Sequence, residues 1–162
     1  MAIAKRVEEF LAASGLPYEI RPHPRSACSA QTARRSHVPL ENLAKPVLLA
    51  DEYGYVLALL PAAKRVDLAR LGAQLHRELE LASEAEIDSL FRDCEPGALP
   101  ALGQPREIPT VYDDALLSLR DVYVEAGGHG DVVWMRGPDY LELLSNAVHG
   151  PFSQAMEHAP GR

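Results

Sequence analysis

Two polar side chains and one loop stand where they could act on a ligand. Lys45 begins an otherwise apolar segment, so its ammonium either reaches solvent or points into the mouth of a pocket. His129 follows two glycines and could donate a hydrogen bond to a substrate or simply complete a turn. Gly97 permits close approach to the backbone between Pro96 and Pro100, so the amides of this loop could face a carbonyl or carboxylate, although a rigid connector would have the same composition.

Other familiar catalytic signatures are absent from the sequence. There is no Gly-x-Ser-x-Gly elbow, Walker loop, His-Glu-x-x-His or Gly-x-Gly-x-x-Gly, so nucleophilic and nucleotide-driven catalysis gain no support. The two cysteines, Cys28 and Cys94, have no metal-ligand spacing, and the separation of His23 from Cys28 is nonspecific. We therefore expect neither a metal nor a cofactor.

The charge of the chain is unevenly spread. The formal net charge is -7, which argues against indiscriminate adhesion to nucleic acid. Residues 1–45 nevertheless carry seven basic and four acidic groups, a local excess of +3. A basic face could therefore meet an RNA backbone, or Arg34 and Arg35 could merely solvate a helix. The acidic balance and the lack of a basic recognition helix disfavour a role in binding DNA.

The elements that must position these residues follow from periodicity and from capping residues. Val7, Phe10 and Leu11 recur at helical spacing after Lys5-Arg6, and Gly15 followed by Pro17 ends that helix. Two apolar runs flank the turn at residues 51–54 and predict a buried hairpin. The other expected elements are a strand at 18–21, helices at 29–37, from 68 after an Asp67 cap, from a Ser83–Glu86 capping box to 91, and at 138–147, and strands at 122–125 and 132–135.

The order of these elements predicts the fold class. Strands and helices interleave without regular alternation, so we predict a single α+β domain, with a mixed β-sheet and surrounding helices, over residues 1–148. Residues 92–109 are rich in proline and glycine and predict a long, stiff loop. We expect residues 149–162 to be a frayed C-terminal tail. No apolar run is long enough for a membrane span and no secretory pattern opens the chain, so the expected location is the cytoplasm, away from membranes.

Several short strings carry a family resemblance, in an order and spacing that chance would rarely give. They are Ala44-Lys45, Leu59-Leu60-Pro61, Val66-Asp67-Leu68, Pro96-Gly97-Ala98-Leu99-Pro100, residues 108–113, and Tyr123-Val124 ahead of Gly127-Gly128. The chain resembles the YbaK/EbsC and ProX superfamily of free-standing aminoacyl-tRNA deacylases, which is similar to the editing domain inserted in bacterial prolyl-tRNA synthetases. The resemblance runs over nearly the whole chain and implies the same mixed-sheet fold.

The resemblance also implies roles for particular residues. In that superfamily the strand-opening lysine is the residue most tied to activity, and it corresponds to Lys45. The loop that shapes the amino-acid pocket corresponds to residues 96–100, with Pro96 in place of its first glycine, so that Pro96, Gly97, Ala98, Leu99 and Pro100 are candidate site residues. His129 falls near a functional histidine of members that remove alanine. Cys28 and Thr32 could line the same pocket or pack in the core.

The implied activity is hydrolysis, without a metal, of the ester that joins a wrong amino acid to tRNA. Alanine, serine and cysteine esters are the expected substrates, with tRNA for proline as one acceptor, and an aminoacyl-tRNA synthetase as a partner is left open. A positioned water or an oxygen of the substrate would attack a carbonyl polarised by loop amides. The alternative is a module that binds aminoacyl-tRNA or an amino acid without turnover, because Pro46 replaces a polar residue beside Lys45.

Overall fold

The predicted hairpin forms the middle of the sheet. In the computed structural model, which describes residues 4–95, 99–102 and 108–156, β2 (Leu43–Asp51) pairs antiparallel with β3 (Gly54–Pro61) along its length. Both strands are rich in leucine, valine and alanine, which suit a sheet covered on both faces. The carboxylate of Asp51 accepts the backbone N–H groups of Tyr53 and Gly54, which closes the turn.

In the part of the chain that the structure describes, eight strands form one mixed sheet, in the order β1-β8-β7-β2-β3-β6-β9 with β5 paired to β2. The pairs β2/β7, β3/β6 and β6/β9 are parallel and the others are antiparallel, which confirms the predicted mixed sheet. The remaining strands of this sheet are β1 (Glu19–Pro22), β5 (Glu80–Leu81), β6 (Thr110–Asp113), β7 (Asp121–Val124), β8 (Asp131–Arg136) and β9 (Val148–Gly150).

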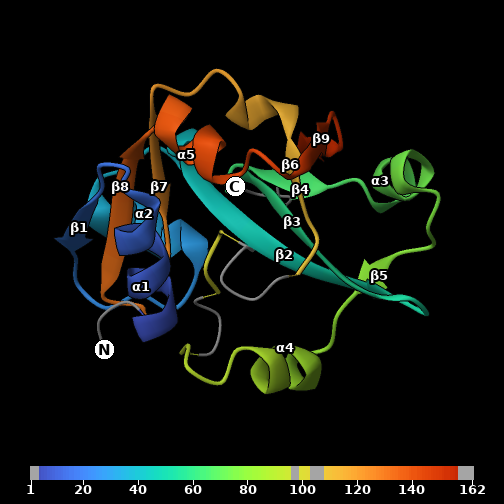
Figure 1. Ribbon diagram of the computed structural model, residues 1–162, viewed down its shortest axis with the longest axis horizontal. Helices are drawn as coiled ribbons and strands as arrows, with labels where there is room; N and C mark the ends of the chain where they lie inside the picture. Colours follow the sequence, from blue (N-terminus) through green and yellow to red (C-terminus); the bar gives the residue numbers. More distant parts are fainter. Residues whose placement is uncertain (1–3, 96–98, 103–107, 157–162) are drawn as a thin grey trace, which may run out of the picture.

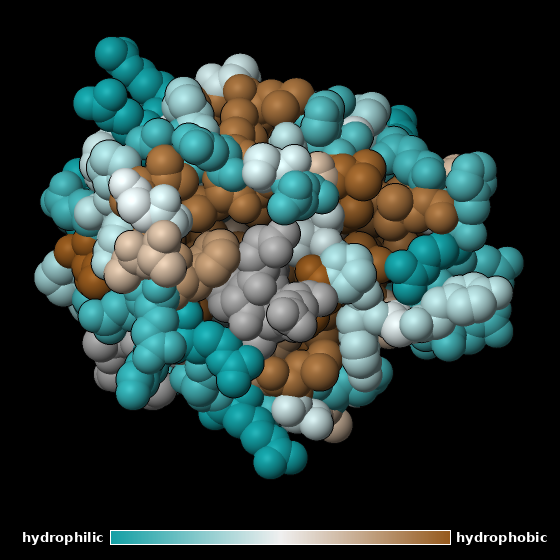
Figure 2. All heavy atoms as spheres, in the orientation of Figure 1, coloured by the Kyte–Doolittle hydropathy of each residue, from teal (hydrophilic) through white to brown (hydrophobic). Residues whose placement is uncertain are grey.

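Within the described residues, five α-helices lie around the sheet, and Figure 1 shows how they are arranged. They are α1 (Lys5–Ser14), α2 (Ser29–Ser36), α3 (Leu68–Leu75), α4 (Glu84–Leu90) and α5 (Gly137–Leu143), with 3-10 turns at Leu40–Asn42 and Asp114–Leu116. Helix α1 buries Val7 and Leu11 in the main core. Helix α2 covers a smaller cluster through Ala33, and α3 covers a third through Leu71. The sheet is thus packed on more than one side, and α2 lies over the start of β2. On the face of the molecule drawn in Figure 2, hydrophilic residues lie mostly around the edge and hydrophobic residues gather toward the middle.

Three of the predicted helix ends are confirmed. Gly15 ends α1 in the left-handed region at φ +72°, where glycine is favoured over other residues. The Asp67 side chain accepts the backbone N–H of Arg70 at the start of α3. Ser83 and Glu86 form both hydrogen bonds of a capping box on α4. Local side-chain chemistry was therefore sufficient to locate these ends.

The C-terminal expectation is partly wrong. Helix α5 ends at Leu143, four residues before the predicted end. Of the segment expected to fray after His149, the described residues, which end at 156, form strand pairs and bury one aromatic side chain. Phe152 is fully buried, and β10 (Ser153–Ala155) pairs with β4 (Lys64–Val66) in a separate two-stranded sheet. The periodicity of so short a strand is too weak to detect, because its partner lies about ninety residues earlier.

Part of the predicted irregular loop enters the core. Leu99, Ala101 and Leu102 are almost completely buried, and the Tyr140 hydroxyl of α5 donates to the Ala101 carbonyl over 2.6 Å. This anchoring fixes Leu99 relative to the sheet. In the described ranges, no helix has both the length and the apolar character needed to cross a membrane.

Candidate functional site

Lys45 lies on the face of β2 that α2 covers. Its neighbour Ala44 packs in the main core, and because side chains alternate along a strand, Lys45 points to the other face. The side chain is half-buried, and burial lowers the pKa of the Lys45 ammonium. It forms no ion pair with any residue of the described ranges. A lysine held in this way keeps its charge available to a ligand.

Lys45 lines a cavity of about 390 Å³. The cavity lies where α2 begins, where β2 begins, where β7 ends and beside α4, and Figure 1 shows α4 set away from the strands of the sheet. The residues that line it are Ser29, Lys45, Pro46, Glu84, Ile87, Asp88, Leu99 and Glu125. One ammonium, three carboxylates and three apolar side chains thus surround a space large enough for a small molecule or the end of a larger one.

Glu125 is the carboxylate that the sequence reasoning missed. It follows β7, which pairs in parallel with β2 so that Val124 lies opposite Ala44. The residues that come next, Glu125 and Lys45, both line the cavity. Only 4% of Glu125 is exposed, and neither carboxylate oxygen has a hydrogen-bond partner of normal geometry among the described residues. Burial raises the pKa of Glu125, while the Thr32 hydroxyl and His129 act in the opposite direction.

The turn after Glu125 is fixed by close backbone packing. Gly127 has φ +106°, and a Cβ atom there would lie 2.6 Å from that of Ala4, so another residue would clash. The backbone N–H of Ala4 donates to the Ala126 carbonyl, and that of Glu95 donates to the Gly127 carbonyl. The Gly-Gly pair visible in the sequence therefore serves to place Glu125. The signal in the sequence that could have identified Glu125 was an acidic residue at the end of an apolar strand, just before these glycines.

His129 and Thr32 lie behind the cavity wall. His129 is 5% exposed, its Nδ1 atom is 3.7 Å from Glu125 Oε2, and its backbone N–H donates to Glu95. Thr32 is fully buried, and its hydroxyl is 2.5 Å from the Ser26 hydroxyl. Neither residue is among those that line the cavity. They surround Glu125 from the protein side.

The remaining predicted site residues fall into three groups. Leu99 lines the cavity, whereas the adjacent Pro100 is buried and does not line it. Cys28 is exposed at the N-cap of α2, one residue before the Ser29 that does line the cavity. Pro96, Gly97 and Ala98 lie outside the described residues.

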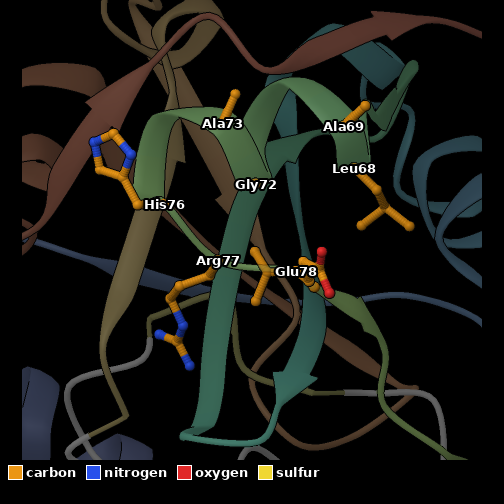
Figure 3. A pocket seen from close by; sticks show the side chains of 8 residues that line it. Leu68, Ala69, Gly72, Ala73, His76, Arg77 and Glu78 are labelled. Carbon is orange, nitrogen blue, oxygen red and sulfur yellow. The ribbon is translucent and has the colours of Figure 1, made fainter.

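A second hollow of about 460 Å³ lies on α3, away from these residues (Figure 3). It is lined by the small residues Ala69, Gly72 and Ala73, with His76 and Arg77 at one side. Arg77 is already paired with Asp51 through two contacts of 2.6 Å. Gly72 is needed because a Cβ atom there would lie 2.6 Å from the Arg77 carbonyl oxygen. These contacts serve the packing of α3, so the Lys45 cavity is the better candidate site.

Comparison with known proteins gives a family and a fold. The model of the aminoacyl-tRNA editing domain matches residues 23–143, which include every described residue of the Lys45 cavity. No curated protein matches the sequence of the chain.

Several solved structures share the fold. One described as hypothetical protein APE2540 is 23% identical, with a TM-score of 0.83 over 93% of this chain and 100% of that one. Another, described as a candidate trans-editing enzyme for prolyl tRNA synthetase, is 20% identical, with a TM-score of 0.79 over 93% and 96% of the two chains. A third, from Marinobacter aquaeolei VT8, is described as a candidate signal transduction protein; it is 25% identical, with a TM-score of 0.74 over 91% of this chain but only 30% of that one.

Proposed function

The chain belongs to the aminoacyl-tRNA editing domain family, and from this premise we propose that it hydrolyses the ester of tRNA mischarged with a small amino acid, namely alanine, serine or cysteine. The observation that carries the proposal is the half-buried ammonium of Lys45 on the wall of the 390 Å³ cavity. The family match covers this cavity. One structural relative of the same fold is described as a candidate trans-editing enzyme for prolyl tRNA synthetase, which makes tRNA for proline a first acceptor to test.

In this proposal Lys45 binds the terminal adenosine or a phosphate of the tRNA acceptor end. Its ammonium meets no competing ion pair among the described residues, so an anionic group of the substrate could bind it directly. Ile87 and Leu99 supply an apolar wall for a small side chain. One methylene changes binding by only about 1 to 3 kcal/mol, so the pocket would tolerate closely related amino acids.

The chemical step would not need a protein nucleophile. An aminoacyl ester is activated, and a positioned water, assisted by the neighbouring ribose hydroxyl of the substrate, could attack its carbonyl and release the amino acid from the ribose oxygen. Amide groups of the loop at residues 96–100 would then stabilise the developing oxyanion, as the family resemblance implies. The side chains that line the cavity would bind and orient the ester.

A binding module without turnover is the second candidate, and Pro46 is the observation that favours it. Pro46 lines the cavity beside Lys45 but offers neither a polar side chain nor a backbone N–H to a substrate. One structural relative is described as a candidate signal transduction protein, in which this fold makes up 30% of the chain. Such a module would bind an aminoacyl-tRNA or an amino acid and release no product.

The experiment that tests the proposal is release of labelled amino acid from tRNAs charged with alanine, serine, cysteine or proline. We expect wild type to hydrolyse at least one mischarged species, and Lys45→Ala to reduce kcat/KM by about a hundredfold. Lys5→Ala is the matched control. Lys5 is exposed on α1, and among the described residues its ammonium forms an ion pair only with Glu9, at 4.0 Å. Full activity of Lys45→Ala, or no release by folded wild type from any species, would contradict the proposal, and binding without release would favour the second candidate.

A further inference from the structure

Glu125 is a buried carboxylate that the proposed chemistry does not yet use. Its oxygens are shielded from water at the wall of the cavity, and no described residue gives them a hydrogen bond of normal geometry. A buried charge without a partner is costly, and native proteins rarely retain one without a reason. The arrangement therefore requires an explanation in terms of what enters the cavity.

Histidines are the basic side chains nearest to Glu125, and they offset its charge only when protonated. His129 Nδ1 lies 3.7 Å from Glu125 Oε2, within ion-pair range but beyond hydrogen-bond distance, on the protein side of the carboxylate. The hydroxyls of Ser29 and Thr32 lie nearby and favour the charged form, but they carry no charge themselves. Lys45 lines the same cavity without forming an ion pair with Glu125. A place for one cation is left on the cavity side.

The other charges of the cavity favour a cation at this place. Glu84 and Asp88 of α4 also line it, so three carboxylates face one ammonium. The two α4 carboxylates are exposed and screened by water, whereas Glu125 is buried, so an electrostatic contact with Glu125 is the stronger one. An anionic group would be accepted only near Lys45.

From this juxtaposition we propose that Glu125 binds the free α-ammonium group of the aminoacyl ester and makes the site selective for esters whose amine is not acylated. This inference rests on the proposed function, because it divides the substrate between two residues. Lys45 takes the anionic or adenosine end, and Glu125 takes the ammonium on the carbon next to the scissile carbonyl. The ester is then held at both ends across the cavity. An N-acylated aminoacyl-tRNA, which has no such cation, would leave the carboxylate unpaired and would be rejected.

The test compares one mischarged tRNA that wild type hydrolyses with the same tRNA after N-acetylation of its amino acid. We expect wild type to prefer the free amine by about tenfold or more in kcat/KM, because the acetylated ester leaves Glu125 without its cation. Glu125→Gln keeps the shape of the side chain and removes its charge. It should slow hydrolysis of the free-amine ester to the rate of the acetylated one and leave the acetylated rate unchanged.

Two control variants separate a specific contact from a general effect of charge. Glu84→Gln and Asp88→Asn each remove one carboxylate from the same cavity and should keep the preference for the free amine. The inference is overturned if Glu125→Gln retains that preference, or if it slows both substrates equally, since the residue would then serve folding or the orientation of Lys45.

A binding measurement keeps the inference testable if the proposed hydrolysis fails. The probe is 3′-alanylamino-3′-deoxyadenosine, an amide that cannot be cleaved as an ester, with its amine free or acetylated. Wild type should bind the free-amine compound more tightly by calorimetry, and Glu125→Gln should bind both equally. Equal binding of both compounds by wild type, or no binding of either, would refute the role of Glu125, whether or not hydrolysis occurs.

Discussion

Asp113 and Glu125 are both buried carboxylates at strand ends, and their surroundings differ completely. Asp113 is 2% exposed and accepts four hydrogen bonds, from the backbone of Phe152, Ser153 and Ala115 and from the Ser153 hydroxyl, at 2.8 to 3.0 Å. Glu125 is 4% exposed and accepts none of normal geometry among the described residues. Burial alone therefore does not distinguish a structural carboxylate from one that awaits a ligand.

The difference lies in what each carboxylate faces. Asp113 is enclosed by the chain's own N–H groups and joins β6 to the segment that carries Phe152. Glu125 faces a cavity that also contains Lys45, and burial raises its pKa. A protein gains stability from the first arrangement and gives up stability in the second. We infer that the cost at Glu125 is retained for binding.

The largest expected effect comes from Asp113→Ala. The variant leaves three backbone N–H groups without their acceptor and releases the segment around Phe152 from the sheet. We expect the free energy of unfolding, measured with urea, to fall by about 3 kcal/mol. Hydrolysis by the remaining folded protein should not change, because Asp113 does not line the cavity.

Asp113→Asn sharpens this prediction. The amide oxygen can replace one carboxylate oxygen, so the loss should be about half that of the alanine variant. A loss of less than about 1 kcal/mol for Asp113→Ala would show that the hydrogen bonds to the C-terminal segment add little. The contrast between the two carboxylates would then rest on Glu125 alone.

Local signals allowed much of the fold to be predicted from the sequence. The hairpin, the cap at Asp67 and the capping box at Ser83 depend on residues close in the chain, and the structure confirms them. The packing around Phe152 depends on Asp113 and on β4, both far away in sequence, so the segment was wrongly expected to fray. Non-local pairing of three-residue strands leaves almost no periodic signal.

The candidate site was predictable only in part, for a similar reason. Lys45 stood out as a lone charge beginning an apolar strand, and Leu99 through its motif, and both line the cavity. Glu125 was read simply as the end of a strand. Its importance appears only when parallel pairing of β7 with β2 brings it beside Lys45, about eighty residues earlier in the chain. The roles of the predicted site residues stay predictions until variants are measured.

A smaller, opposite effect is expected from Glu125→Gln on stability. Because the pKa of Glu125 is raised in the folded protein, ionisation favours the unfolded state at neutral pH, where the unfolded carboxyl is charged without penalty. The variant should therefore raise the free energy of unfolding at pH 7 by about 1 kcal/mol. As pH falls through the raised pKa toward the ordinary value of 4.5, wild type regains this stability and the difference should disappear.

The measurement is a series of urea unfolding curves of both proteins between pH 4 and 8, in which the groups that do not interact with Glu125 cancel. A variant that is less stable than wild type at pH 7 would mean that Glu125 is satisfied in the empty protein. That result would place it with Asp113 and remove the contrast.

The smallest effect concerns Asp51, a carboxylate at the far end of β2 whose charge is fully paired. Contacts with Arg77, followed by the N–H groups of Tyr53 and Gly54, lower its pKa to about 2. A lowered pKa stabilises the fold above the ordinary value of 3.8, and this stability is lost as pH falls through about 2. Arg77→Met should move the pKa of Asp51 back toward 3.8, as followed by NMR titration of its carboxyl carbon.

Hydrolysis should not change in Arg77→Met. Arg77 does not line the Lys45 cavity, and its partner Asp51 lies six residues after Lys45 on β2. An unshifted Asp51 would mean that the turn amides, rather than Arg77, hold its charge. The comparison would then change in kind: Asp51 and Asp113 would both be carboxylates satisfied mainly by backbone N–H groups. Glu125 would differ from them because its turn, fixed by the close packing of Gly127 on Ala4, directs no such group toward it.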